Sequence, residues 1–156
     1  MSRKILTIVL SVFLGASIVF AESNTPKANT RQDIKAYVEA AANYVAKHGP
    51  SCDEFAEKDW RGGDYYIFVL GPDDRAICHP NASLIGKPIE EIIDKNGKHA
   101  GEMIAAAGKK KDGGWVDYVW PRPGTDNAVA KSTYAMHVKG PDGKTYIVGS
   151  GGYELK

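Results

Sequence analysis

The sequence has no excess of charge of either sign. Its 156 residues include 20 Lys and Arg against 19 Asp and Glu, which gives a formal net charge of +1. Proteins that bind nucleic acid through its phosphates usually carry a basic patch or a high isoelectric point. The balance of charges therefore gives no argument for a nucleic-acid partner.

Signatures of catalysis and of metal binding are also missing. The four histidines are scattered, at positions 48, 79, 99 and 137, and form no metal-ligand spacing. The Gly-Ser-Gly-Gly run at 149–152 follows an expected strand with no helix after it, so it lacks the geometry of a phosphate-binding loop. Ser150 lacks the flanking sequence of a nucleophile elbow. We predict that the chain is not an enzyme and holds no metal or cofactor.

Long hydrophobic runs are absent after residue 20. The run at 5–20 carries no charge and follows Arg3 and Lys4, and small residues precede a potential cut after Ala21. The alternative is a retained membrane anchor, but the run is shorter than the roughly 20 residues that a spanning helix needs. The sequence predicts a signal peptide over residues 1–21 and a periplasmic or secreted mature chain. About 135 residues then remain, which is the size of one domain.

Cysteine is scarce, with two residues, Cys52 and Cys78. Both lie in the part expected to be exported, and an even count in an oxidising compartment favours one disulfide. The alternatives are two reduced thiols or a metal pair completed by His79. A Cys-His dipeptide falls short of the four ligands of a structural zinc site. We predict a disulfide between Cys52 and Cys78.

The apolar periodicity predicts one long helix near the start of the mature chain. Residues 22–29 are polar and include a proline, so we expect a flexible lead-in there. From 34 to 45 the apolar residues recur in steps of three and four. The segment 30–33, Thr-Arg-Gln-Asp, is similar to a capping box, and Gly49-Pro50 ends the pattern.

The rest of the chain has the pattern of strands with helical interruptions. Strand-like runs occur at 65–70, 75–79, 115–120, 132–138 and 144–148, and helical patches occur at 89–93 and 100–107. Gly-Pro-Asp turns follow the first and fourth strands. A long N-terminal helix followed by an antiparallel sheet with a helical insertion is an α+β fold.

Several short motifs occur in a defined order along the chain. They are a Gly-Pro-Asp-Asp turn after an aromatic strand, His79-Pro80-Asn81, Leu84-Ile85-Gly86-Lys87-Pro88, Tyr118-x-Trp120-Pro121, Lys131-Ser132-x-Tyr134 and Val148-Gly149-Ser150-Gly151. Their order resembles a single Cache domain of the second type over residues 30–156. The resemblance implies a PAS-like antiparallel sheet of about five strands behind a long N-terminal helix. It also implies a pocket for small carboxylates or other metabolites between the sheet and the helical insertion.

The resemblance and the residue types give seven candidate ligand-binding residues: His79, Tyr118, Trp120, Lys131, Tyr134, Tyr66 and Met103. Lys131 is expected to be the main cation for a ligand carboxylate. Tyr118 and Trp120 share a strand face and are expected to form apolar walls. The others are expected to serve as polar contacts (His79, Tyr134), floor (Tyr66) and lid (Met103). The plain alternatives are core packing for the aromatic and Met side chains, a solvated strand edge for Lys131 and a turn cap for His79.

We therefore expect an exported, sensor-type Cache domain that binds a small organic carboxylate, as in chemotaxis and other signal transduction. Family members often sit between two membrane helices ahead of a signalling module. This sequence shows neither a second hydrophobic segment nor an output domain before Lys156, so we expect a free binding subunit or a partner of a separate membrane receptor. The alternative is an interaction module that docks on a membrane receptor or redox partner without a ligand. The long helix is a candidate homodimer surface.

Overall fold

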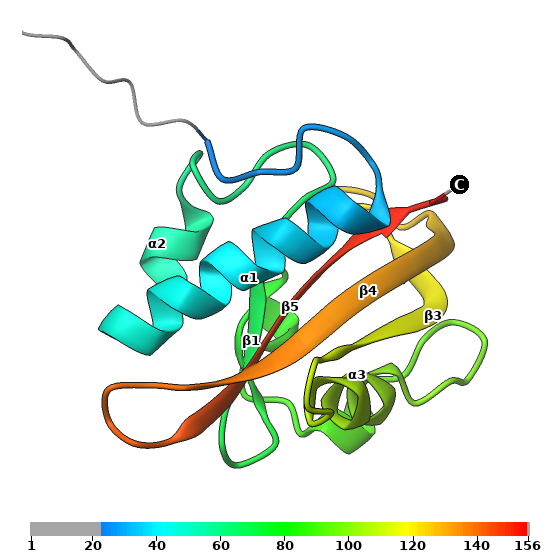
Figure 1. The fold of residues 1–156 in the computed structure, drawn as a ribbon. Helices are drawn as coiled ribbons and strands as arrows, with labels where there is room; N and C mark the ends of the chain where they lie inside the picture. The colour runs from blue at the N-terminus through cyan, green and yellow to red at the C-terminus, as the bar shows by residue number, and fades with distance from the viewer. Residues whose placement is uncertain (1–22, 156) are drawn as a thin grey trace, which may run out of the picture.

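A five-stranded antiparallel sheet lies at the centre of the fold in a computed structural model, which describes residues 23–155 (Figure 1). Its strands are β1 (Phe68–Leu70), β2 (Ala76–Cys78), β3 (Gly114–Pro121), β4 (Ala128–Lys139) and β5 (Thr145–Tyr153). Their spatial order is β2-β1-β5-β4-β3. The predicted α+β class, with a PAS-like antiparallel sheet and a helical insertion, is confirmed. The predicted signal peptide and its cleavage site lie outside the described residues.

Helix α1 (Arg31–His48) lies across one face of the sheet, where it contacts β4 and β5 (Figure 1). Its apolar stripe is buried against the strands. Thr30 caps its start, because the side-chain oxygen accepts the backbone N–H of Asp33 at 3.1 Å and the hydroxyl donates to the Asp33 carboxylate at 2.7 Å. Gly49 ends the helix with a φ of 80°, a value that favours glycine. The long helix predicted from the periodicity is confirmed.

The chain between β2 and β3 covers the opposite face of the sheet. It contains two short 3₁₀ helices, η1 (Ala82–Leu84) and η2 (Ile89–Glu91), and then helix α3 (Ala100–Gly108). Helix α3 packs on β3 and β4. The sheet therefore separates two apolar cores, one beneath α1 and one beneath this insertion.

A disulfide joins the short helix α2 (Cys52–Ala56) to β2. The Cα atoms of Cys52 and Cys78 lie 5.2 Å apart, within the usual range for a disulfide. The predicted pairing is confirmed. Because Cys78 directly precedes His79, the bridge anchors the end of β2, where the candidate site begins.

Asp94 fastens the insertion to the outer edge of β3. Its carboxylate accepts backbone N–H groups from Asn96 (2.8 Å), Lys98 (2.8 Å) and Val119 (3.0 Å). Burial opposes the ionised form, but these donors outweigh it and lower the pKa of Asp94. The linker before α3 is thus held against β3, the strand that carries Tyr118 and Trp120.

Residues 23–29 form neither helix nor strand but contact the rest of the fold. The backbone N–H of Asn24 donates to the carbonyl of Asp59 at 2.8 Å, and the side-chain amide of Asn29 donates to the carbonyl of Tyr153 at 2.8 Å. Within the described range 23–155, no helix is long and apolar enough to cross a membrane.

Candidate functional site

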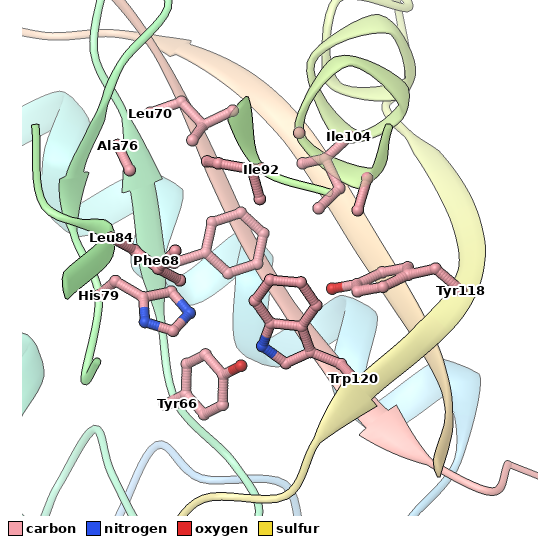
Figure 2. A pocket seen from close by; sticks show the side chains of 12 residues that line it. Tyr66, Phe68, Leu70, Ala76, His79, Leu84, Ile92, Ile104, Tyr118 and Trp120 are labelled. Atoms are coloured by element: carbon pink, nitrogen blue, oxygen red, sulfur yellow. The ribbon is translucent and has the colours of Figure 1, made fainter. Parts of the chain in front are cut away.

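An inner cavity of about 30 Å³ lies between the sheet and the helical insertion (Figure 2). Apolar side chains and one glycine form most of its wall: Phe68, Leu70, Ala76, Leu84, Ile92, Ala100, Gly101, Ile104 and the ring of Tyr118. One water needs roughly 10–15 Å³ of such volume, so the cavity has room for about two waters. A short hydrocarbon chain matches both its size and its lining.

Polar atoms gather at one end of this cavity, on Tyr66, His79 and Trp120. The same three side chains also line an outer cleft of about 440 Å³. In Figure 2 the hydroxyl of Tyr66 and the indole nitrogen of Trp120 point toward one another, with the imidazole of His79 beside them. This junction is where a ligand with an apolar tail in the inner cavity would have its polar head.

The hydrogen bonding of His79 makes it a donor at this junction. Its Nδ1 accepts the backbone N–H of Asn81 at 2.9 Å, so the proton of the neutral ring lies on Nε2. Burial, together with the nearby charge of Lys131, lowers the pKa of His79 to about 3. His79 is therefore a neutral N–H donor at physiological pH rather than a cation.

Lys131 lies directly behind Tyr66. Its Nζ donates to the hydroxyl of Tyr66 at 2.6 Å and lies 4.2 Å and 4.9 Å from the ring centroids of Tyr66 and Tyr153. The side chain is 2% exposed, and no ion pair among the described residues includes it. Burial lowers the pKa of Lys131 to about 7, opposed by the charge of Asp64.

The strand register explains why Lys131 is enclosed. On β4 it lies opposite Tyr118 of β3 on one side and Tyr153 of β5 on the other. The Tyr118 hydroxyl shares a hydrogen bond of 2.9 Å with Thr133, and the Tyr153 hydroxyl donates to a backbone carbonyl, so both phenols have hydrogen-bond partners other than Nζ. The lysine stem thus runs between two rings within the sheet rather than at a solvated edge.

Two glycines of β5 make the close packing possible. A Cβ on Gly149 would lie 2.3 Å from Cζ of Phe68. One on Gly151 would lie 2.5 Å from the carbonyl oxygen of Ser132 and from Oγ1 of Thr133, and 2.9 Å from Cε of Lys131. These distances are too short for real Cβ atoms. The run at 149–152 is part of β5, and the absence of side chains at Gly149 and Gly151 leaves room for the floor of the cavity and for the lysine stem.

The outer cleft carries two arginines with different roles. Arg122 forms ion pairs with Asp64 and Glu154 and lies over the ring of Tyr153, with 5.0 Å from its guanidinium carbon to the centroid. Arg61 is exposed, and none of the ion pairs among residues 23–155 includes it. Arg61 therefore offers an uncompensated positive charge on the rim, which attracts anions toward the junction.

The structure brings five of the seven candidate residues together: Tyr66, His79, Tyr118 and Trp120 on the wall of the inner cavity, and Lys131 behind Tyr66. They come from β3, β4, the end of β2 and the residues just before β1. Their roles in ligand binding remain predictions.

Tyr134 and Met103 lie elsewhere. Tyr134 faces α1 on the opposite side of the sheet, where its hydroxyl donates to the carbonyl of Asp112 and its ring packs on Trp115, with 5.4 Å between centroids. Side chains alternate along a strand, so residues 131 and 134 cannot share a face. Met103 is 37% exposed on α3, and its neighbour Ile104 enters the cavity instead. We withdraw both from the candidate site.

Sequence reasoning missed Tyr153 and the apolar wall residues Ile92 and Ile104. The signal for Tyr153 was available, because pairing counted outward from the hairpin turn at 140–143 places it opposite Lys131. The wall residues lie in the insertion, whose path over the sheet follows from contacts such as those of Asp94 rather than from local periodicity.

Comparison with known proteins identifies the family. The sequence model of the Cache domain matches residues 53–156, which is most of the chain. The chain belongs to the Cache domain family. The part of this Cache domain that matches includes the sheet, the helical insertion and every wall residue of the inner cavity.

A curated relative of this Cache domain is the methyl-accepting chemotaxis protein McpP of Pseudomonas putida. The two are 37% identical over 90 residues, which cover 57% of this chain and 16% of that receptor. The chain therefore corresponds to a small part of a much longer relative.

Solved structures of similar fold include chemoreceptor domains. A methyl-accepting chemotaxis protein from Vibrio parahaemolyticus has a TM-score of 0.59 at 19% identity, over 78% of this chain and 86% of that one, and supports the fold alone. The periplasmic sensor domain of a chemotaxis protein has a TM-score of 0.53 at 27% identity, over 79% and 87%. A Cache chemosensory domain whose structure describes carboxylic acid recognition has a TM-score of 0.51 at 30% identity, over 77% and 73%.

Proposed function

We propose that this Cache domain is an exported sensor domain that binds a small carboxylate, with the carboxylate at the junction of the two cavities and the tail in the inner one. The observation that carries the proposal is Lys131, a fully buried cation behind the polar end of an otherwise apolar cavity. A buried lysine without a counter-ion destabilises a fold, so its presence needs a compensating role.

The donors at the junction suit a carboxylate. The Nε2–H of His79 and the Nε1–H of Trp120 both belong to side chains that line the junction. Tyr66 lines the junction beside them, and its hydroxyl accepts a hydrogen bond from Lys131. A carboxylate accepts several such hydrogen bonds, and a cation one side chain behind strengthens each of them in a dry site.

The lining also favours a plain acid over an amino acid. No Asp or Glu lines the inner cavity, and the outer cleft includes one, Asp126, on the rim beside Thr125. An α-ammonium group at the junction would therefore meet donors and the charge of Lys131 instead of acceptors. The volume near 30 Å³ further favours acids of two or three carbons.

The relatives support this assignment. The Cache chemosensory domain described for carboxylic acid recognition is 30% identical to this chain, and similar domains belong to chemotaxis proteins. A periplasmic location and a role in chemotaxis signalling are part of the proposal. Export is expected to follow cleavage after Ala21, so the intact mass of the exported protein should begin at Glu22.

The alternative is an interaction module without a ligand, which should present an apolar patch on its long helix. The apolar stripe of α1 is instead buried against the sheet. The exposed large apolar side chains among the described residues are Ile85, Ile93 and Met103, and they belong to the insertion. The cavity with its buried cation and the polar surface of α1 both favour ligand binding over the docking module. A homodimer through α1 stays a prediction.

Ligand capture and a titration panel test the proposed function. Native mass spectrometry of the protein isolated after export should show a bound small acid. Isothermal titration with acetate, propionate, butyrate, succinate and alanine should give the tightest binding for acetate or propionate, with alanine and succinate at least tenfold weaker. No co-purifying acid and no heat from any member of the panel would favour the docking module.

A further inference from the structure

We propose that this site takes up one proton when a carboxylate binds, and that the proton resides on Nζ of Lys131. The inference rests on the proposed function, because it requires an anion at the junction. It adds that the site recognises the acid together with a proton, so that the ligand signal depends on pH.

The surroundings of Nζ lack a compensating negative charge in the free protein. The groups that face it from neighbouring strands are neutral phenols and a neutral imidazole: Tyr66, Tyr118, Tyr153 and His79. Burial raises the pKa of the three tyrosines, so none of them supplies a phenolate. An ammonium group here is solvated by one hydroxyl and two ring faces.

The charged groups of the outer cleft do not change this balance. Asp64 is the carboxylate that acts on Lys131, but its side chain is bound to Arg122, which also pairs with Glu154. Arg61 adds a positive charge on the rim. Among the described residues neither these carboxylates nor Asp126 on the rim forms an ion pair with Nζ, so burial favours the uncharged amine above about pH 7 in the free protein.

A bound carboxylate reverses that preference. The free amine, a proton from solvent and the carboxylate anion combine into an ammonium–carboxylate pair across the hydroxyl of Tyr66. No bond between heavy atoms forms or breaks, and the net charge of the site is the same before and after binding. The proton has a route through the outer cleft, which reaches Tyr66 from the surface.

His79 does not accept this proton. Its Nδ1 already accepts the N–H of Asn81, and its ring packs edge-on against Tyr66 with 5.1 Å between centroids, where the charge of a protonated Lys131 acts on it. A protonated His79 would therefore be repelled by a protonated Lys131. The lysine is the base that remains available.

Calorimetry in two buffers measures the proton directly. Propionate is titrated at pH 8 into the exported protein in phosphate and in Tris, whose ionisation enthalpies differ. We expect uptake of about 0.9 proton per propionate at pH 8, the neutral fraction of a lysine with a pKa of about 7. Above pH 7 the affinity should fall by up to about tenfold per pH unit.

Two variants test whether the proton resides on Lys131. Lys131→Arg keeps a permanent charge, so any binding that remains should proceed without proton uptake. His79→Gln keeps a donor but removes the imidazole, and its uptake should equal that of the wild type. Uptake that survives in Lys131→Arg, or disappears in His79→Gln, would overturn the assignment to Lys131.

The same data separate the two proposals. Binding of propionate with identical enthalpies in both buffers, after correction for dilution, overturns proton uptake and leaves the proposed function intact. No binding of any acid in the panel overturns both. As a check on the free protein, ¹³C-labelled lysine should show one resonance, absent in Lys131→Met, that titrates near neutral pH. A Lys131 resonance that titrates with the exposed lysines also overturns the inference.

Discussion

The burial of Lys131 destabilises the folded protein, and the same side chain carries the proposed function. Its amine is buried among aromatic rings and receives compensation from one hydroxyl. Because burial lowers the pKa of Lys131 to about 7, the unfolded chain binds a proton that the folded protein lacks between about pH 7 and the usual lysine value near 10.4. The free energy of unfolding should therefore rise with pH across this range.

The predicted slope is up to about 1.4 kcal/mol per pH unit from Lys131, measured by urea denaturation at half-unit steps from pH 6.5 to 9.5. Above that range the buried tyrosines, whose pKa values are raised in the folded protein, lower the free energy of unfolding as pH rises. The contribution should vanish in Lys131→Met and persist in the matched control Lys139→Met, since Lys139 is exposed. Equal pH slopes in the wild type and Lys131→Met would contradict the buried, depressed lysine.

Asp94 gives a second prediction at this scale. In Asp94→Asn one carboxylate oxygen becomes an NH₂ group, so a backbone N–H now faces a donor, at Val119 or at the Asn96–Lys98 turn. We expect a loss of about 1–3 kcal/mol in the free energy of unfolding at pH 7. Because the pKa of Asp94 is lowered in the folded state, its contribution is present above the unfolded value near 4 and is lost as pH falls through the folded value.

Denaturation at pH 7 and at pH 3 tests this prediction. The difference between the wild type and Asp94→Asn should be smaller at pH 3, whereas the exposed control Glu90→Gln should match the wild type at pH 7. A constant difference at both pH values would show that the charge of Asp94 does not hold the insertion.

The site residues show where sequence reasoning succeeded and failed. Strand alternation placed Tyr118 and Trp120 on one face, and both line the cavity. The same rule, applied to Lys131 and Tyr134, separates them, because three positions along a strand reverse the face. The burial of Lys131 could not be predicted, since it depends on its partners across both neighbouring strands.

At the scale of elements, glycines in β5 decide how closely the strands pack. The Cβ of Gly149→Ala would overlap the ring of Phe68, so we expect a loss of about 1–3 kcal/mol in stability from overpacking. All of the nearest atoms belong to that ring. The substitution Phe68→Leu should therefore recover part of the loss when it is combined with Gly149→Ala.

A double-mutant cycle by thermal or chemical denaturation measures this coupling. We expect the two substitutions together to cost less than the sum of their separate effects by at least about 0.5 kcal/mol. Additive effects would indicate that the backbone of β5, rather than the ring of Phe68, is the reason that position 149 requires glycine.

Element positions were largely predictable from periodicity and turns, whereas their ends were not. The strand expected at 144–148 continues to Tyr153 as β5, because hydrogen bonds to β4 outweigh the low strand propensity of its glycines. The strand expected at 65–70 has regular pairing from Phe68, since Tyr65 instead bridges to Gly62. In both cases tertiary pairing overrides the local signal.

At the scale of the whole molecule, the disulfide ties the segment after α1 to the sheet. Cys52 and Cys78 are 26 positions apart, so chain-entropy arithmetic gives a stabilisation of about 3.5 kcal/mol. Reduction of the wild type, or Cys52→Ser with Cys78→Ser, should lower the unfolding free energy by about this amount. The double variant should not respond to reductant. An unchanged stability in the reduced wild type would contradict the prediction.

We propose that one buried cation, Lys131, gives this Cache domain an affinity for a small acid. Titration calorimetry with propionate at pH 6.5, where Lys131 is largely protonated, compares the wild type with Lys131→Met and Lys139→Met. Loss of a desolvated charge partner costs about 2–5 kcal/mol, so Lys131→Met should weaken binding by about 30-fold or more, whereas Lys139→Met should bind like the wild type. Equal affinities of Lys131→Met and the wild type would contradict the account.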